Sequence, residues 1–281
     1  LVVEIFLMSA FLTMNAADNQ LQQMNAAHYV QTGSFWFSGP LSMLLAGVSE
    51  SGLILIERTM WWLHIIGILA FALYVTYSKH LHIFMAFPNT YYGKLEPAGI
   101  IENMAAIQNE VRIALGLESD PNLAPPDKFG AKDIQDLSWK HLMDAYSCTQ
   151  CGRCTAACPA NQTGKILSPR KIMMDTRRRT DEVGMLIDKK QENKIADRPL
   201  LGTYISREEI LACTSCNACV EACPVSINPL DIIIELRRNM IMEEAHAPAS
   251  WNAMFNNLEK NGAPWAFSPS DRGNWVSQAS S

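Results

Sequence analysis

Two short cysteine runs constrain this chain more than any other feature of its sequence. The first reads CTQCGRCTAACP and begins at Cys148, and the second reads CTSCNACVEACP and begins 65 residues later, at Cys213. Both have the spacing C-x2-C-x2-C-x3-C-P, and together they contain all 8 cysteines of the 281 residues. Cysteines gathered in two tight groups do not suit a disulfide scaffold, because spacing rather than number decides how thiols are used.

This spacing is typical of the ligands of two [4Fe-4S] clusters. Three cysteines in one tight loop can turn their thiolates toward three irons of one cube, while the fourth, which precedes a proline, ligates the other cluster. Structural zinc is the alternative, but it uses separated ligand pairs rather than four cysteines in one run. The predicted ligands are Cys148, Cys151, Cys154 and Cys223 for the first cluster, and Cys213, Cys216, Cys219 and Cys158 for the second.

A second repeat follows the two cysteine runs. The segments SPRKIMMDTRR and NPLDIIIELRR begin at Ser168 and Asn228, and each has an N-cap residue, a proline, an apolar triplet and an arginine pair. Each run is therefore expected to lead into a capped helix. The arginines at 177–179 and 237–238 form either a docking face or a solvated helix surface. The net charge of −5 argues against a nucleic acid partner.

The chain up to about residue 87 differs from the rest, because it is apolar and nearly free of Lys and Arg. Its first sixteen residues predict the end of a membrane helix that begins upstream, and the segment from Met60 to Phe84 is long enough for a second span. Residues 17–57 contain no Lys or Arg, whereas basic residues follow the second segment. The positive-inside rule then predicts a multi-pass protein whose cysteine-bearing part is cytoplasmic.

Composition shifts predict an all-α chain in four parts. These are a transmembrane domain over 1–87, an amphipathic linker over 88–130, a compact α-helical domain over 131–246 and an extended tail over 247–281. Within the linker, apolar spacing predicts a helix over 99–115. The tail carries Trp251, Trp265 and Trp275, and either docks a partner or packs on its own domain.

Histidine is uncommon within an apolar segment, and two of them are separated by 18 residues, His64 and His82. On one continuous helix this spacing is five full turns, so both would share a face, whereas His80 would point elsewhere. Imidazole in a bilayer is a functional-site hypothesis, and it is a common axial ligand of haem. The pair is thus predicted to ligate haem, unless both are interfacial. Glu4, Lys79 and His80 are weaker candidates for a quinone or proton site.

The cysteine runs, with a charged helical segment between them, resemble the α-helical ferredoxin domains of heterodisulfide reductase, succinate dehydrogenase and the small subunit of anaerobic glycerol-3-phosphate dehydrogenase. The histidine pair with its SKHLHIF ending resembles the haem b membrane subunit of respiratory nitrate reductase and that of heterodisulfide reductase. Both together look like the fused membrane iron-sulfur oxidoreductases of bacteria. One departure stands out: no residue here matches the opposite axial ligands of the family's haems.

The resemblance implies a subunit that relays electrons between a cytoplasmic redox partner and the menaquinone pool, through two [4Fe-4S] clusters and two b-type haems. It implies a bacterial inner-membrane location. No Cys-Cys pair, GxGxxG or P-loop pattern occurs in the chain, so the substrate site is expected on a partner. That partner is either a heterodisulfide reductase-like chain with a Cys-Cys-Gly domain or an electron-transfer flavoprotein. The alternatives are a haem-free membrane-tethered ferredoxin module and an iron-sulfur redox sensor.

Overall fold

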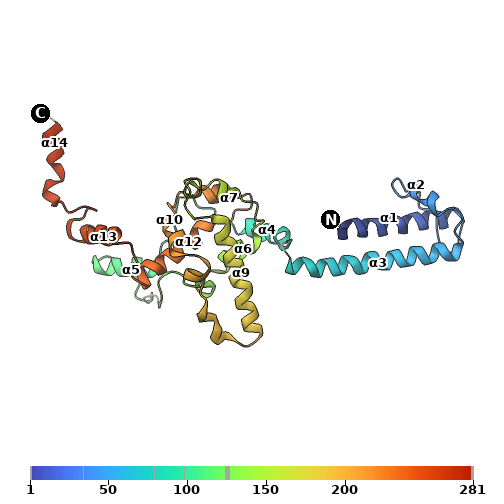
Figure 1. The fold of residues 1–281 in the computed structure, drawn as a ribbon, viewed down its shortest axis with the longest axis horizontal. Coiled ribbons are helices and arrows are strands. Elements are labelled where there is room, and N and C mark those ends of the chain that lie inside the picture. Colours follow the sequence, from blue (N-terminus) through green and yellow to red (C-terminus); the bar gives the residue numbers. More distant parts are fainter. Residues whose placement is uncertain (1, 34, 79, 98, 124–126, 280–281) are drawn as a thin grey trace. The chain divides into compact units, whose positions relative to one another are not determined.

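The structure is a computed structural model that describes residues 2–33, 35–78, 80–97, 99–123 and 127–279. Within these residues all the regular elements are helices, which confirms the predicted all-α class. The chain divides into two compact units, Leu1–Leu81 and His82–Ser281, called here the helix-pair unit and the cysteine unit (Figure 1).

The helix-pair unit consists of two long helices and a short connection. Helices α1 (Val2–Gln23) and α3 (Glu50–Tyr77) lie side by side, and α2 (Gly39–Ser42) and η1 (Met43–Leu45) lie in the segment that joins them (Figure 1). The pair is antiparallel, since Leu21 near the end of α1 is buried together with Leu53 near the start of α3. Near the start of α1, Leu7 meets Gly67, where an added Cβ would lie 2.4 Å from the Leu7 Cδ2.

Of the described helices, only α3 is long and apolar enough to cross a membrane. It has 28 residues, which span about 42 Å. Its apolar window is 6% buried, so its side chains find little cover within the chain. The multi-pass topology expected from the sequence stays a prediction.

The bounds predicted for the second span, Met60 to Phe84, differ from those of the long apolar helix, because the helix begins earlier and is interrupted near the end of that segment. α3 ends at Tyr77, and α4 (Leu81–Tyr91) begins as a separate helix. Between them Ser78 is extended, and its Oγ donates to the Val75 carbonyl at 3.2 Å and accepts from the His80 N–H at 3.1 Å. A serine side chain here replaces backbone bonds that would have continued the helix.

This break removes the helical-phase argument for the histidine pair. His64 lies on α3 in the helix-pair unit, and His82 lies on α4 in the cysteine unit. A spacing of 18 residues places two side chains on one face only when the helix between them is continuous. The break coincides with the polar run TYSKH at residues 76–80, which the predicted span included because it was assigned from the apolar character of the whole segment.

The core of the cysteine unit lies between helices α9 and α12, whose buried side chains include Ile172, Met173, Ile232 and Ile233. Both predicted N-caps are confirmed, since Ser168 accepts from the Lys171 N–H and Asn228 accepts from two backbone N–H groups of α12. The elements after α4 are α5 (Ala105–Ala114), η2 (Ile134–Asp136), α6 (Trp139–Ser147), α7 (Arg153–Ala156), α8 (Pro159–Gln162), α9 (Pro169–Asp188), η3 (Glu192–Asp197), η4 (Leu200–Tyr204), α10 (Arg207–Ala212), α11 (Ala218–Glu221), α12 (Pro229–Arg238), η5 (Asn239–Glu243), α13 (Ala249–Asn261), η6 (Pro269–Gly273) and α14 (Asn274–Ala279).

Some of the segment boundaries predicted from the sequence agree with the observed helices, and others do not. The boundary expected at residue 87 falls inside α4, and the helix predicted over 99–115 is α5, which begins later. The prediction of an extended tail over 247–281 is wrong, because α13 and α14 lie within it. α13 ends at Asn261, and its cap residue Gly262 has a left-handed φ of 61°, which closes the helix. The four-part division itself stays a prediction.

Candidate functional site

Each cysteine run folds into the same kind of loop followed by a one-turn helix. The second and fourth residues after the first cysteine have positive φ in both runs: 59° and 83° at Gln150 and Gly152, and 56° and 62° at Ser215 and Asn217. The one-turn helices α7 and α11 begin at the next residue in each case. The repeat in the sequence is therefore also a repeat in backbone conformation, and it curls each loop around its own cysteines.

The two loops enclose two cavities. The Cys148 cavity is lined by Cys148, Cys151 and Cys154 of the first run and by Cys223 of the second. The Cys213 cavity is lined by Cys213, Cys216 and Cys219 of the second run and by Cys158 of the first. These are the two ligand sets predicted from the sequence, and the structure brings each of them together. Cys219 also lines the Cys148 cavity, so the two sites are neighbours.

The donor set fits an iron-sulfur cluster better than one small ion. Among the described residues, no three His, Cys, Asp or Glu side chains are placed to hold a single metal ion, and each cysteine set surrounds a cavity instead. Backbone N–H groups also point at the sulfurs, with Ser215 donating to Cys213 Sγ at 3.4 Å and Ile227 to Cys223 Sγ at 3.3 Å. Such hydrogen bonds stabilise thiolate ligands and tune cluster potentials.

The cysteines differ in how readily they give up a proton. Burial raises the pKa of the Cys148 and Cys154 thiols, and raises that of Cys219 to about 12. The exposed Cys151 has a lowered pKa, chiefly because the backbone N–H of Arg153 donates to it. Only the thiolate is a metal ligand, so binding at the buried positions must displace protons.

Two of the arginines considered for a docking face are internal hydrogen-bond donors instead. Arg237 donates to the carbonyl oxygens of Ile210 and Cys213, both at 2.8 Å, and so fixes the start of the second cysteine loop. Arg179 is 0% exposed and makes a two-pronged contact with Asp133, with Nη2 to Oδ2 at 2.6 Å. The docking interpretation therefore does not hold for these two side chains.

A polar network that the sequence analysis missed ties α4 to the wall of the Cys148 cavity. Asn89 is fully buried, and its Nδ2 donates to the carbonyl of Val225, which lines that cavity, at 2.9 Å. Lys140 donates to Asn89 Oδ1 at 3.0 Å and to Asp144 Oδ1 at 2.6 Å. Burial raises the pKa of Asp144, and Lys140 opposes that shift. The only sequence signal was the spacing of four between Lys140 and Asp144.

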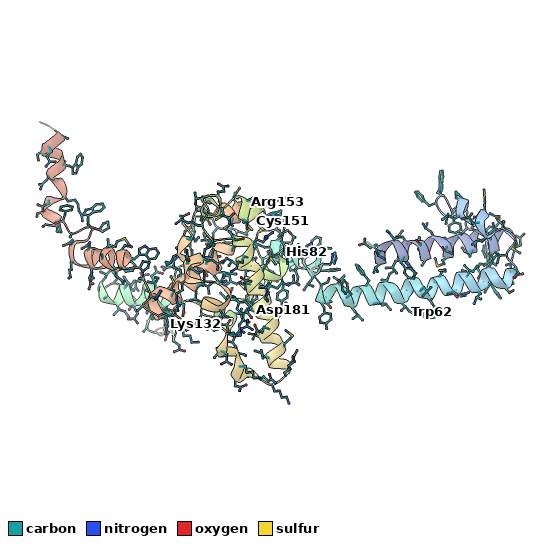
Figure 2. The ribbon with its side chains drawn as sticks, in the orientation of Figure 1. Trp62, His82, Lys132, Cys151, Arg153 and Asp181 are labelled. Carbon is teal, nitrogen blue, oxygen red and sulfur yellow. The ribbon has the colours of Figure 1, made fainter. Side chains whose placement is uncertain are left out.

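The histidine and quinone-site candidates are distributed over both units. The ring Nδ1 of His64 lies 3.0 Å from the Leu7 carbonyl oxygen, which can only accept, so Nδ1 carries a proton and donates it to this carbonyl. His80 is half-buried beside the helix break, and His82 is half-buried on α4 (Figure 2). Glu4 is exposed near the start of α1. Lys79 lies outside the described residues.

A family model described as a 4Fe-4S dicluster domain matches residues 147–227, which contain all eight cysteines. The chain is 29% identical over 268 residues to "Probable iron-sulfur-binding oxidoreductase FadF" of Bacillus subtilis, covering 85% of this chain and 36% of that protein. It is 28% identical over 261 residues to "EtfAB:quinone oxidoreductase" of Syntrophomonas wolfei, covering 86% of this chain and 34% of that protein. Over 168 residues it is 30% identical to "Probable membrane-anchored ferredoxin" of Chromohalobacter salexigens, covering 53% and 24%.

The homologues are thus iron-sulfur oxidoreductases, some of them quinone-linked or membrane-anchored by name, and the matched domain supports iron-sulfur clusters. The chain spans about a third of the length of the first two relatives.

Proposed function

We propose that this chain is a membrane-anchored electron-transfer subunit that relays electrons between a cytoplasmic redox partner and the quinone pool through two [4Fe-4S] clusters. One observation carries the proposal: each cavity is lined by three cysteines of one run and the fourth cysteine of the other. This exchange is the ligation pattern of two-cluster ferredoxins. The clusters supply one-electron chemistry, and the chain supplies thiolates, N–H donors and an apolar wall.

The closeness of the two cavities supports a relay rather than two separate sites. Cys219 belongs to the ligand set of the Cys213 cavity and also lines the Cys148 cavity. Electrons can therefore pass between the sites over a short distance inside the cysteine unit. No nucleophile, acid or base is needed for such transfer, which agrees with a substrate site on another polypeptide.

The membrane part of the proposal rests on α3 and on His64. With Nδ1–H donating to the Leu7 carbonyl, Nε2 of His64 is the ring nitrogen that would bind a metal, which is the arrangement used by metal-bound histidines. We propose b-type haem at His64, with His82 as the second candidate ligand, and menaquinone as the diffusible substrate. The proposed partner is a cytoplasmic chain, either heterodisulfide reductase-like with a Cys-Cys-Gly domain or an electron-transfer flavoprotein, and the proposed location is the bacterial inner membrane.

The test is the cofactor content and quinone reactivity of the full chain, purified in detergent under anaerobic conditions. We expect about eight irons per chain from the clusters, because each cube holds four. A menaquinol analogue should reduce the protein, or the reduced protein should reduce the quinone. A chain with iron and sulfide that exchanges no electrons with either quinone form would contradict the relay.

A haem-free tethered ferredoxin is the second candidate, and two observations favour it. One relative is named a membrane-anchored ferredoxin, and the helix break separates the two histidines proposed as ligands. The haem α-band decides between them. The proposal predicts a b-type band that disappears in His64→Ala and persists in His141→Ala, a control on α6. A preparation with full iron content and no haem band would favour the tethered ferredoxin.

A further inference from the structure

The two cavities repeat the same backbone but differ in the charge of their walls. Two arginines, Arg153 on α7 and Arg170 on α9, line the Cys148 cavity. At the matching positions of the second repeat the chain has Ala218 and Leu230, and Leu230 lines the Cys213 cavity. The Cys148 cavity therefore has two cationic side chains where the Cys213 cavity has none.

The one-turn helices carry part of this difference in charge. α7 reads RCTA and begins with the cation Arg153, whereas α11 reads ACVE and begins with Ala218; the anion Glu221 at the end of α11 lines neither cavity. Lys171, which follows Arg170, does not add to the positive wall, because Asp175 and Glu209 bind it at 3.0 and 2.9 Å. The difference between the two walls therefore comes from Arg153 and Arg170.

Burial acts in the same direction as charge. Cys158 and Cys219, two of the four thiols of the Cys213 set, are buried, whereas all four of the Cys148 set are half-buried or exposed. Reduction adds one electron to a [4Fe-4S]²⁺ centre held by four thiolates, so the total charge of the site goes from 2− to 3−. A buried apolar site disfavours that extra charge, and nearby cations or solvent favour it.

One cation opposes this trend. Arg237 binds the Cys213 carbonyl at 2.8 Å, while its repeat counterpart Arg177 lies over the Tyr146 ring, with the guanidinium carbon 5.1 Å from the ring centroid. Arg237 is not among the residues that line the Cys213 cavity. The comparison is therefore one cation outside the wall of the Cys213 cavity against two cations in the wall of the Cys148 cavity.

We infer that the cluster in the Cys148 cavity has the higher reduction potential, so that a single electron resides there, and that Arg153 and Arg170 set this order. The inference rests on the proposed function, because it requires both cavities to hold clusters. It assigns the two sites distinct roles: the Cys148 site stores the electron, and the Cys213 site passes it on at lower potential.

The test is a potentiometric titration of the full chain with dithionite, followed by electron paramagnetic resonance. Arg153→Ala and Arg170→Leu install the residues of the second repeat. Each variant should lower the equilibrium constant for reduction of the higher-potential cluster about tenfold. For a one-electron step this lowers its midpoint potential by about 59 mV. The reciprocal change, Ala218→Arg, should raise the lower-potential signal by a similar shift. Arg153→Lys keeps the charge and should stay near wild type.

Salt and a distant charge serve as controls. Because Arg153 and Arg170 are exposed, added salt should screen their charges and reduce the difference between the two cluster midpoint potentials in the wild type. The same salt should change this difference less in Arg153→Ala. Arg272→Ala removes one positive charge from the tail and should leave both signals in place. If Arg153→Ala moved the lower-potential signal, or neither signal, the inference would be wrong while the relay could stand. Absence of two cluster signals would overturn the proposed function and the inference with it.

Discussion

The helix-pair unit and the cysteine unit differ in how far they bury their apolar side chains. In the cysteine unit, α9 and α12 bury their apolar faces against each other, and Ile172, Ile232 and Ile233 are fully buried. In the helix-pair unit the apolar window of α3 is 6% buried, so most of its apolar surface needs cover from outside the chain. The cysteine unit therefore has an apolar core of its own, whereas α3 leaves most of its apolar side chains exposed. Changes in one unit should therefore leave the other unaffected.

The largest effects should come from the cysteines, which tie distant parts of the cysteine unit together. Cys223→Ser should remove the cluster in the Cys148 cavity, although its other three ligands lie about 70 residues away in the chain. Iron content should fall by about half, since one of two cubes is lost. The Cys151→Ser/Cys223→Ser double variant should lose no more iron than either single variant.

The matched control for this prediction pairs Cys151→Ser with Cys158→Ser, which belong to the same run but to different cavities. That double variant should lose both clusters. If instead Cys151→Ser/Cys158→Ser lost only as much iron as one single variant, all four cysteines of a run would bind the same cluster, and the assignment of ligands by cavity would be wrong. The protection of the backbone amides of α3 against hydrogen exchange should be the same in all these variants.

Arg179→Ala should give the next largest effect, again confined to the cysteine unit. It leaves Asp133 without its buried partner, and breaking such a pair costs about 3–5 kcal/mol. The urea midpoint, followed by the visible absorbance of the clusters, should fall accordingly. Arg178→Ala removes the neighbouring arginine, whose side chain is 64% exposed, and should cost under about 1 kcal/mol. Equal losses in the two variants would show that the Arg179 pair is not a buried structural contact.

The contrast between the units also explains which predictions from sequence succeeded. In the cysteine unit, ligand spacing, N-caps and prolines specify local geometry, and the cavities and both helix starts follow from them. In the helix-pair unit the argument relied on the apolar character of a long segment, and it did not treat the polar run TYSKH at residues 76–80 as an interruption. The helix break depends on one serine hydroxyl that bonds to Val75 and His80, and the period of apolar residues carries no signal for that.

Some features of the site could not be predicted from the sequence, because only the folded chain brings their residues together. Arg153 and Arg170 lie on different helices, and only the fold places both on one cavity wall. Asn89 and Val225 are 136 residues apart, and a lone buried amide leaves no pattern to detect. Long-range partners of this kind lie beyond spacing rules, which describe one helix or one loop at a time.

In the helix-pair unit, Gly67→Leu should push α1 away from α3 and leave the clusters intact. Even a Cβ at this position would lie 2.4 Å from Leu7, and overpacking of this kind costs about 1–3 kcal/mol. The fluorescence of Trp61 and Trp62 on α3, followed during thermal unfolding in detergent, should report a lower midpoint. Adding Leu7→Ala should restore part of the loss by making room. A change in iron content would show that the two units are coupled.

The smallest effect should come from a pair of surface ion pairs in the cysteine unit. Arg207 and Lys132 bind Glu244 at 2.7 and 2.9 Å, and the hydrogen bond from Arg207 is the main reason that the pKa of Glu244 is lowered. A lowered pKa stabilises the folded state above the unfolded pKa, and this contribution is lost as the pH falls through the folded pKa. Glu244→Gln should thus cost under about 1 kcal/mol at neutral pH, because both partners are partly exposed.

The pH dependence distinguishes this contribution from a simple loss of packing. The difference in thermal midpoint between wild type and Glu244→Gln should be constant near neutral pH, and it should shrink as the pH falls below the ordinary pKa of a glutamate toward the lowered pKa of Glu244. Glu259→Gln on the exposed face of α13 should show no comparable difference. If the difference in thermal midpoint between wild type and Glu244→Gln grew on acidification, the protonated form of Glu244 would stabilise the fold more than the carboxylate does. Its assignment as the ion-pair acceptor for Arg207 and Lys132 would then be wrong.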